Sequence, residues 1–161
     1  MLSIIVAKAK NNVIGKNDEL IMKLPAESKK FRELTEGKNV IMGRKTYDIL
    51  GKYLRERNVI VFSNNPDFRV STPNAKVVHS MLEIQQYIED RNENYVIGGA
   101  MIYRLLMQYV TKLYVTEVDK DFDGDAVFPR INEEVWKEVS REKGPDDVKD
   151  FGYEYITYIR K

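Results

Sequence analysis

Three short apolar runs, each ending in a small residue, place the strongest constraint on the fold of this chain. Because these runs lack polar/apolar alternation, they are typical of strands that are covered on both faces. Two of them lead directly into helical patterns, and strands interleaved with helices form mostly parallel sheets. Residues 2–9 add a further central strand. The three runs are Val40-Ile41-Met42 before Gly43, Val59-Ile60-Val61-Phe62 before Ser63, and Tyr95-Val96-Ile97 before Gly98-Gly99.

The last third of the chain has a different pattern. Residues 112–118 and 151–159 are suited to strands, and no long helical stretch separates them. A polar turn with Gly144-Pro145 precedes the second strand, so we expect antiparallel strands at one edge of the sheet. The fold class predicted is therefore α/β, with a mostly parallel central sheet flanked by helices and an antiparallel C-terminal edge. The two-residue period places alternate residues of the final strand on one face: Phe151, Tyr153, Tyr155, Thr157 and Ile159.

Composition narrows the function classes. The 161 residues suit one domain, 1–161, and a formal net charge of +1 argues against a general nucleic-acid-binding surface. The absence of cysteine excludes disulfides, thiol nucleophiles and cysteine-based metal sites, and the single His79 excludes a multi-histidine site, so no metal is predicted. The first apolar run ends at Lys8, too short for a signal peptide or a membrane span. A cytoplasmic enzyme fits these features.

Two helices have clear start signals. Ser80 and Glu83 form a capping-box pattern before a helix at 81–90, while Pro25 and Gly37 bound a helix at 25–36. In the second helix Glu27 falls on the same stripe as Leu24, Phe31 and Leu34. Glu27 either interacts with the free amides and the dipole at the helix start, or it is a buried carboxylate that faces a ligand with N–H donors.

Two strand-to-helix turns are candidate phosphate sites. Gly98-Gly99 lets backbone amides approach an anion, although the pair is not a full dinucleotide fingerprint and also suits a plain tight turn. Gly43-Arg44-Lys45-Thr46 places two cations and a hydroxyl at a helix start, where solvated surface charge is the alternative. Both turns would lie at the carboxyl ends of parallel strands, where open α/β sheets bind ligands.

Taken together, the motifs resemble those of the dihydrofolate reductase family. They occur in the family's order and at its spacing over nearly the whole chain. The matching segments are Ile4-Ile5-Val6-Ala7, Asn12-Val13-Ile14-Gly15, Leu24-Pro25-Ala26-Glu27, Val40-Ile41-Met42-Gly43-Arg44-Lys45-Thr46-Tyr47, Arg57, Val96-Ile97-Gly98-Gly99-Ala100-Met101-Ile102-Tyr103, Leu113-Tyr114-Val115-Thr116 and Gly124-Asp125-Ala126-Val127-Phe128-Pro129.

The resemblance implies NADPH-dependent reduction of 7,8-dihydrofolate to 5,6,7,8-tetrahydrofolate, in support of one-carbon metabolism. It assigns Glu27 as the carboxylate that binds the pteridine ring and supports protonation at N5, and Arg57 as the partner of the glutamate-tail carboxylate. Tyr103 would lie beside the nicotinamide as a further catalytic residue. The remaining substrate positions would form the walls of the pocket: Ile5, Ala7, Phe31, Leu50, Leu54, Ile97 and Thr116.

The resemblance also implies the cofactor site. Arg44, with Ser63 and Asn64 nearby and Lys76 as a second candidate, would bind the 2′-phosphate of NADPH. Gly98-Gly99 matches a cis-linked pair, which is rare without proline. Residues 9–24 match a mobile loop over the nicotinamide. The full set expected to bind the cofactor is Ala7, Ile14, Gly15, Leu20, Gly43, Arg44, Lys45, Thr46, Ser63, Asn64, Lys76, Gly98, Gly99, Ala100, Met101 and Ile102.

One position departs from the family. The loop usually has Pro-Trp where this chain has Ile21-Met22, and the only tryptophan, Trp136, lies elsewhere. The indole N–H normally helps to hold a water near the pterin, and Met22 has no donor. Met22 is therefore either a gap-filling residue or a catalytic-loop residue whose missing donor affects proton delivery.

Three functions are consistent with the sequence. The first is a dihydrofolate reductase that acts as a monomer, with antifolate inhibitors as further ligands and without nucleic-acid or membrane partners. The second is a related pyrimidine or pteridine reductase, against which Arg57 and Phe31 argue. The third is a folate- or NADPH-binding protein with little turnover, supported only by the missing loop tryptophan. A steady-state assay of NADPH oxidation with dihydrofolate discriminates among them.

Overall fold

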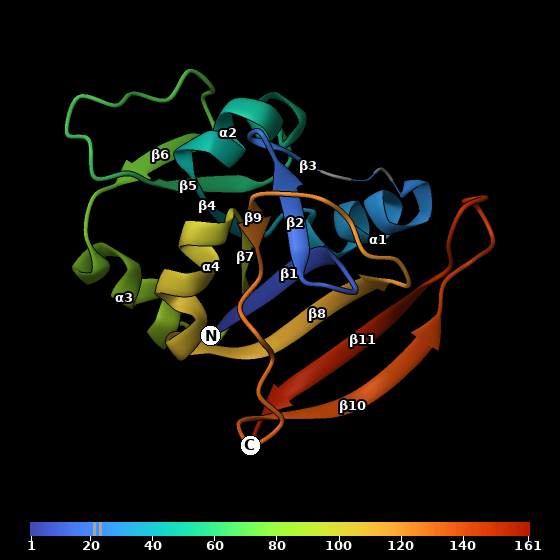
Figure 1. Cartoon of the computed structure of the whole chain (residues 1–161). Helices are drawn as coiled ribbons and strands as arrows, with labels where there is room; N and C mark the ends of the chain where they lie inside the picture. Colours follow the sequence, from blue (N-terminus) through green and yellow to red (C-terminus); the bar gives the residue numbers. More distant parts are fainter. Residues whose placement is uncertain (21, 23) are drawn as a thin grey trace.

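An eight-stranded sheet forms the centre of the molecule, in a computed structural model that describes residues 1–20, 22 and 24–161 (Figure 1). The strand order is β10-β11-β8-β1-β7-β4-β5-β6. Pairings from β8 through β6 are parallel, whereas β11 is antiparallel to both β8 and β10. The predicted fold class is therefore confirmed. The strands are β1 (Leu2–Ala9), β4 (Asn39–Gly43), β5 (Asn58–Phe62), β6 (Ala75–Val78), β7 (Asn94–Gly98), β8 (Val110–Val118), β10 (Trp136–Lys143) and β11 (Tyr153–Arg160).

Within the described part of the chain four α-helices cover the sheet, and a small second sheet packs beside it (Figure 1). The helices are α1 (Pro25–Thr35), α2 (Arg44–Leu50), α3 (Met81–Glu89) and α4 (Ala100–Leu106), with 3-10 turns at Gly51–Tyr53 and Met107–Tyr109. The small sheet has the order β3-β2-β9 and consists of β2 (Val13–Lys16), β3 (Glu19–Leu20) and β9 (Ala126–Val127). It joins the segment after β1 to the segment after β8.

Both faces of the sheet are buried, as the continuous apolar runs predicted. Alternate residues of β1 enter different clusters: Ile4 and Val6 pack with α3 and α4, whereas Ile5 packs with α1 and α2. Because side chains alternate along a strand, each central strand supplies both cores at once. Ligands are thereby excluded from the faces of the sheet and can reach only the ends of its strands.

Several predicted boundaries and patterns need correction. The helix predicted at 25–36 ends at Thr35, and the one at 81–90 ends at Glu89. In the capping box, Ser80 Oγ accepts from the Glu83 amide at 3.4 Å, while the Glu83 carboxylate accepts from the amide of His79.

The prediction for the final strand was wrong in part. The strand begins at Tyr153 rather than at Phe151, and it buries Tyr153 on one face and Ile156 on the other. Tyr153 and Tyr155 pack in a small cluster with Leu24, whereas Ile156 joins the main core. Period-two spacing gives the two faces of a strand correctly, but it does not show that both will be partly covered.

Among the described residues, no helix is long and apolar enough to span a bilayer, and no group of three or more metal-ligating side chains is found.

Glu93 is the centre of a polar cluster near the amino ends of β1, β7 and β8. Its carboxylate accepts from Ser3 Oγ at 2.5 Å and from the hydroxyls of Tyr95 and Tyr114, each at 2.9 Å. These hydrogen bonds and the charge of Lys112 lower the pKa of Glu93, against the raising effect of its partial burial. Ser3 and Tyr95 are almost fully buried, so the carboxylate satisfies hydroxyls that water does not reach.

We predict that Glu93→Ala lowers the free energy of unfolding by about 1–3 kcal/mol near neutral pH, because it leaves buried hydroxyls without an acceptor. A carboxyl whose pKa is lower in the folded state contributes stability above its unfolded pKa and loses it as the pH falls through the folded value. The difference in free energy of unfolding between the wild type and Glu93→Ala should therefore become smaller in acid. Urea unfolding at a series of pH values measures it, and a difference that does not change with pH would contradict this role.

Candidate functional site

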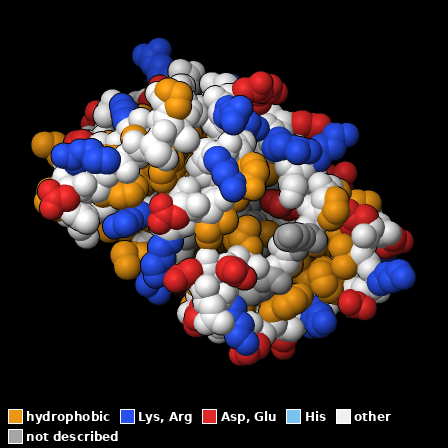
Figure 2. Space-filling model, turned by 90° about the horizontal axis from the view of Figure 1, so that it is seen from above, with side chains coloured by type: hydrophobic (Ala, Val, Ile, Leu, Met, Phe, Trp, Pro, Cys, Tyr) orange, Lys and Arg blue, Asp and Glu red, His pale blue; other side chains and the backbone are white. Residues whose placement is uncertain are grey.

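The connections of the sheet diverge at β1 and β7. After β1 the chain continues to β4, beyond β7, and after β7 it crosses to β8 on the other side of β1. Such a switch point opens a crevice at the carboxyl ends of the two strands. Seen from above, the surface has a hollow lined by hydrophobic side chains and surrounded by acidic and basic ones (Figure 2).

Glu27 is a half-buried carboxylate in the first turn of α1. Within residues 1–20, 22 and 24–161 the structure gives it no hydrogen-bond partner, and the residue before the helix, Leu24, supplies no side-chain cap. Burial raises the pKa of Glu27, and the positive charge of Lys30 offsets part of this rise. Because the Ala26 amide in the same turn donates to another side chain and not to Glu27, the geometry favours the inward-facing alternative.

Tyr103 lies on α4 and is almost fully buried. Its hydroxyl donates to the backbone oxygen of Ile5 at 2.8 Å. Burial raises the pKa of the Tyr103 phenol far above its usual value, and the negative charge of Glu27 raises it further. The phenol therefore stays neutral and holds the middle of β1 against α4. A Cβ on Gly98 would lie 3.3 Å from the Tyr103 hydroxyl, so this ring packs directly against the Gly98-Gly99 turn.

The predicted wall residues gather on the face of the sheet that α1 and α2 cover. Ile5, Leu54 and Ile97 are buried there in one cluster, with Phe31 and Leu50 half-buried beside them. Ala7 is half-buried near the end of β1, and Thr116 is buried opposite it on β8. These seven positions thus connect the core to the crevice. An apolar wall with few polar groups is suited to a planar aromatic ligand.

Arg57 is buried and anchored to α1. Its Nε donates to Thr35 Oγ1 at 3.1 Å, and Nη2 donates to the backbone oxygen of Arg32 at 2.8 Å. Arg57 lines an open cavity of about 520 Å³ together with Lys52, Tyr53, Arg55 and Glu56. The fixed guanidinium beside two further cations is suited to a carboxylate ligand.

Two glycine-capped helices meet next to the switch point. Gly43 is the N-cap of α2 and Gly99 is the N-cap of α4, and neither helix has a side-chain cap. A Cβ at Gly43 would come within 2.9 Å of Ile102 Cγ1, and one at Gly99 within 3.6 Å of Thr46 Oγ1. The missing side chains leave the first-turn amides accessible, as a phosphate requires. The peptide bond Gly98-Gly99 is cis, as the resemblance implied.

These features agree with the comparisons with known proteins. The family model described as dihydrofolate reductase matches residues 1–160. The dihydrofolate reductase of Bacillus subtilis is 37% identical over all of this chain and 95% of its own length, and that of Staphylococcus haemolyticus is 34% identical over 98% and 93%. The chain belongs to the dihydrofolate reductase family. It is therefore an oxidoreductase that reduces dihydrofolate with NADPH.

The similarity extends to three dimensions. A solved structure described as dihydrofolate reductase from Enterococcus faecalis complexed with NADP(H) and RAB-propyl superposes with a TM-score of 0.89 at 32% identity. The match covers 100% of this chain and 96% of that one. The fold predicted from the motifs and the fold of this reductase family are thus the same.

In this reductase, the charged residues predicted for the cofactor lie at two separate places. Arg44 is exposed over the ring of Phe68, 4.9 Å from its centroid, and Ser63 is buried at the end of β5 next to exposed Asn64. Lys76 instead lies near the amino ends of the strands, over the ring of Tyr87. The structure therefore brings Arg44, Ser63 and Asn64 to the carboxyl edge but does not bring Lys76 there.

His79 lies directly after β6, at the end of the strand next to β5. Its Nδ1 is 2.8 Å from the backbone oxygen of Ser63. His79 therefore lies beside the predicted 2′-phosphate residues. The sequence signal that could have pointed to His79 is a basic side chain directly after the strand that pairs with β5.

Two ion pairs between exposed side chains join the segment after β1 to α2 and to the segment after β8. Lys45 pairs with Asp18 at 3.0 Å and Lys16 with Asp123 at 2.5 Å. The predicted cofactor residues in this segment differ in exposure, because Ile14 and Gly15 are buried and Leu20 is 66% exposed. On helix α4, Ala100 is half-buried and Met101 is exposed.

The structure describes only part of the Ile21-Met22 departure, because Ile21 lies outside the described residues. Met22 is half-buried and packs against the cluster of Leu24, Val118 and Tyr153. This placement favours the gap-filling alternative over a role in proton delivery.

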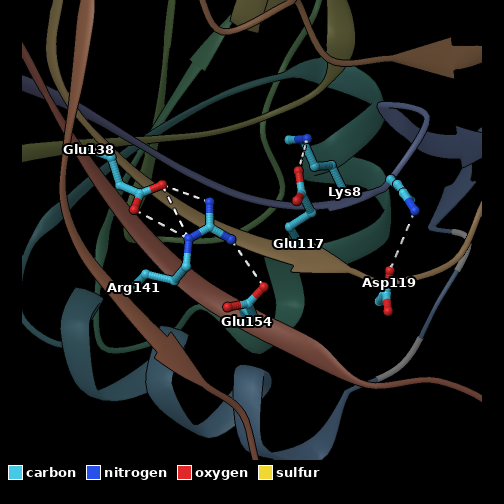
Figure 3. Close-up of polar contacts among 7 residues, drawn as sticks. Lys8, Glu117, Asp119, Glu138, Arg141 and Glu154 are labelled. Atoms are coloured by element: carbon cyan, nitrogen blue, oxygen red, sulfur yellow. Dashed lines mark hydrogen bonds and ion pairs between the residues drawn. The ribbon is translucent and has the colours of Figure 1, made fainter. Parts of the chain in front are cut away.

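A partly buried ion pair fixes the end of β1, where this loop begins. Lys8 Nζ donates to Glu117 Oε1 of β8 at 2.6 Å (Figure 3). It also donates to Asn12 Oδ1 at 2.9 Å. Figure 3 also shows Arg141 between Glu138 and Glu154, which ties β10 to β11. Lys8 and Glu117 were not paired from the sequence, since their contact depends on the parallel register of β1 and β8.

We predict that Gly43→Ala weakens NADPH binding at least tenfold and lowers stability by about 1–3 kcal/mol, since the new Cβ would clash with Ile102 and displace α2 or α4. Gly152→Ala is the control, because its Cβ would meet nothing within 4 Å. Fluorescence titration and urea unfolding measure the two effects. Tight NADPH binding by Gly43→Ala would show that the closeness of the two helix starts is not required.

Proposed function

We propose that Glu27 is the group through which this reductase binds the pterin ring of dihydrofolate and supports protonation at N5. The observation that carries the proposal is a desolvated carboxylate that forms no hydrogen bond or ion pair with the described side chains and feels only the more distant charge of Lys30. Such a group gains most from a ligand with adjacent N–H donors, which the 2-amino and N3 positions of a pterin provide. Its negative charge also favours the protonated ring.

The other residues have supporting roles. Ile5, Phe31 and Ile97 would hold the pterin between apolar walls and exclude water. Arg57 would bind the carboxylate of the glutamate tail through its outward N–H groups, while Thr35 and Arg32 fix its orientation. When bound, NADPH supplies the hydride that reaches C6 of the pterin.

The amides at Gly43 and Gly99 support the placement of the cofactor phosphates, and Arg44 with Ser63 and Asn64 supports recognition of the 2′-phosphate. Thr46, Lys45, Ala100 and Ile102 surround these turns. Lys76 has no such support, and His79 replaces it as the candidate beside Ser63.

The two rival functions have less support. A pteridine reductase without a glutamate-tail substrate gives no reason for a buried, anchored Arg57 beside two further cations. A binding protein with little turnover remains distinguishable by the assay of NADPH oxidation with dihydrofolate. Turnover of dihydrofolate well above that of tail-less pterins supports the proposal.

We further propose that the chain acts as a single-domain monomer, 1–161, in the cytoplasm, with antifolates as competing ligands. The edge strand β10 supports the monomer, because it is charged and contains a register shift between Glu138 and Ser140. Charges and bulges on an edge strand oppose pairing with a second chain. Sedimentation velocity tests the monomer.

We predict that Glu27→Gln lowers turnover of dihydrofolate roughly 100-fold or more near neutral pH, within the range of general acid–base effects. It should leave NADPH affinity within twofold. Burial raises the pKa of Glu27 in the folded state, so the folded protein binds more protons than the unfolded chain, and the wild type loses stability as the pH rises through this interval. The variant should therefore be as stable as the wild type in acid and at least as stable at neutral pH.

Turnover assays and urea unfolding across pH measure both effects. Glu33→Gln is the matched control, since Glu33 is exposed on the other side of the same helix. Near-normal turnover in Glu27→Gln would overturn the assigned role.

A further inference from the structure

The start of α1 has an unusual shortage of capping groups. The N-cap residue Leu24 has no side-chain oxygen, and Pro25 has no amide hydrogen, so Ala26 supplies the first backbone donor of the helix. A first-turn acid such as Glu27 commonly accepts from such free amides. Glu27 does not accept from the Ala26 amide, so this amide needs another acceptor.

A residue far along the chain accepts this hydrogen bond. The Ala26 amide donates to Asp147 Oδ2 at 3.3 Å, across 121 positions of sequence. Asp147 lies in the connection between β10 and β11. Its side chain thus caps α1 from another part of the fold.

Asp147 is itself held in place by Tyr153. The Tyr153 hydroxyl donates to Asp147 Oδ1 at 2.7 Å, so the two carboxylate oxygens have separate partners. Tyr153 is 3% exposed and packs in one cluster with Leu24, the residue that precedes α1. The amide of Gly144 donates to the Tyr153 backbone oxygen at 2.9 Å, and a Cβ at Gly144 would collide with the Tyr153 ring. The connection is therefore packed around the same tyrosine that positions Asp147.

We propose that Asp147 is a positioning residue for catalysis: it occupies the first free amide of α1 and so leaves the Glu27 carboxylate pointing into the substrate crevice. The inference rests on the proposed role of Glu27. Without the cap, the Glu27 side chain is the nearest carboxylate to the free amide on its own helix. It would turn back to accept from this amide and give up its position for the pterin.

The charged and titratable groups around Glu27 come from four elements. Lys30 lies on α1, Tyr103 on α4 and Tyr155 on β11, while Asp147 approaches from the connection between β10 and β11. Lys30 also lies over the Tyr155 ring, 3.8 Å from its centroid. Asp147→Ala removes a charge that acts on Tyr155, and Asp147→Asn removes the same charge, so the comparison of the two variants separates the lost charge from the lost hydrogen bond. A shift in the titration behaviour of Glu27 would then report the new hydrogen bond.

The test is single-turnover hydride transfer across pH, with Asp147→Ala compared with Asp147→Asn. In Asp147→Ala, a hydrogen bond from the freed amide stabilises ionised Glu27 and lowers its pKa. The rate should begin to decline at lower pH than in the wild type. We expect kcat/KM for dihydrofolate to fall about threefold to tenfold at neutral pH, the size of one hydrogen bond. The loss should lie mainly in KM.

Asp147→Asn keeps an oxygen acceptor at the same position and should restore most of the wild-type profile. Tyr153→Phe removes only the hydroxyl that holds Asp147 and should shift the profile in the same direction as Asp147→Ala, by less. Tyr153→Phe also tests the idea if Asp147→Ala fails to fold. Asp146→Ala is the control, because Asp146 is exposed and makes no hydrogen bond or ion pair within the part of the chain that the structure describes.

An Asp147→Ala enzyme that is less stable but has the wild-type pH profile and KM would overturn the inference, since capping would then serve only the fold. Equal losses in Asp147→Ala and Asp147→Asn would also overturn it. Failure of the proposed function gives a different result: Glu27→Gln itself would keep normal turnover, whatever happens at Asp147.

Discussion

Burial of the central sheet on both faces is the constraint on which the rest of the structure depends. Ile4 and Ile5 enter opposite cores although they are neighbours in β1, and the same alternation holds in the parallel strands around it. With both faces filled, backbone and side chains can meet a ligand only at strand ends. The crossing of connections at β1 and β7 opens one of these edges. Glu27, Tyr103, Gly43 and the Gly98-Gly99 turn all lie at that edge.

The electrostatics of the edge follow from the same burial. Glu27 has an elevated pKa because the crevice removes water from it, and its charge helps to keep Tyr103 neutral. Positive charge instead lies at Arg44 on α2 and at Arg57 beside α1, the residues proposed to bind the anionic groups of the cofactor and the substrate. An apolar centre with one carboxylate and separate cationic groups is suited to a neutral ring that carries anionic groups at a distance.

Much of this arrangement is visible in the sequence, and the reasons are local. The Val/Ile runs, Pro25 at the start of α1 and the glycines at 43 and 98–99 each determine structure within a few residues. The spacing of Glu27 with Phe31 and Leu34 is likewise enough to direct the carboxylate toward the apolar side of its helix.

The features that could not be predicted from the sequence depend on distant contacts. Strands β3 and β9 have two residues each and exist only because β2 lies between them. The Lys8–Glu117 pair requires the register of β1 against β8, and the Asp147 cap requires a connection that lies 121 positions further along the chain. The position of Lys76 near the amino end of β6, beside Tyr87, likewise depends on the fold, because a basic residue in a short strand can lie near either end of it. None of these relations has a period or a motif.

The central claim is that this fold holds Glu27 as a desolvated, unpaired carboxylate facing the pterin position. Carbon-13 NMR titration of the glutamate side-chain carboxyls, with Glu27→Gln to assign the signal, measures the pKa of this group directly. We expect a pKa above the ordinary glutamate value of 4.5 in the protein without substrate. A Glu27 pKa at or below 4.5 would show that the helix start has captured the carboxylate, and it would contradict the claim.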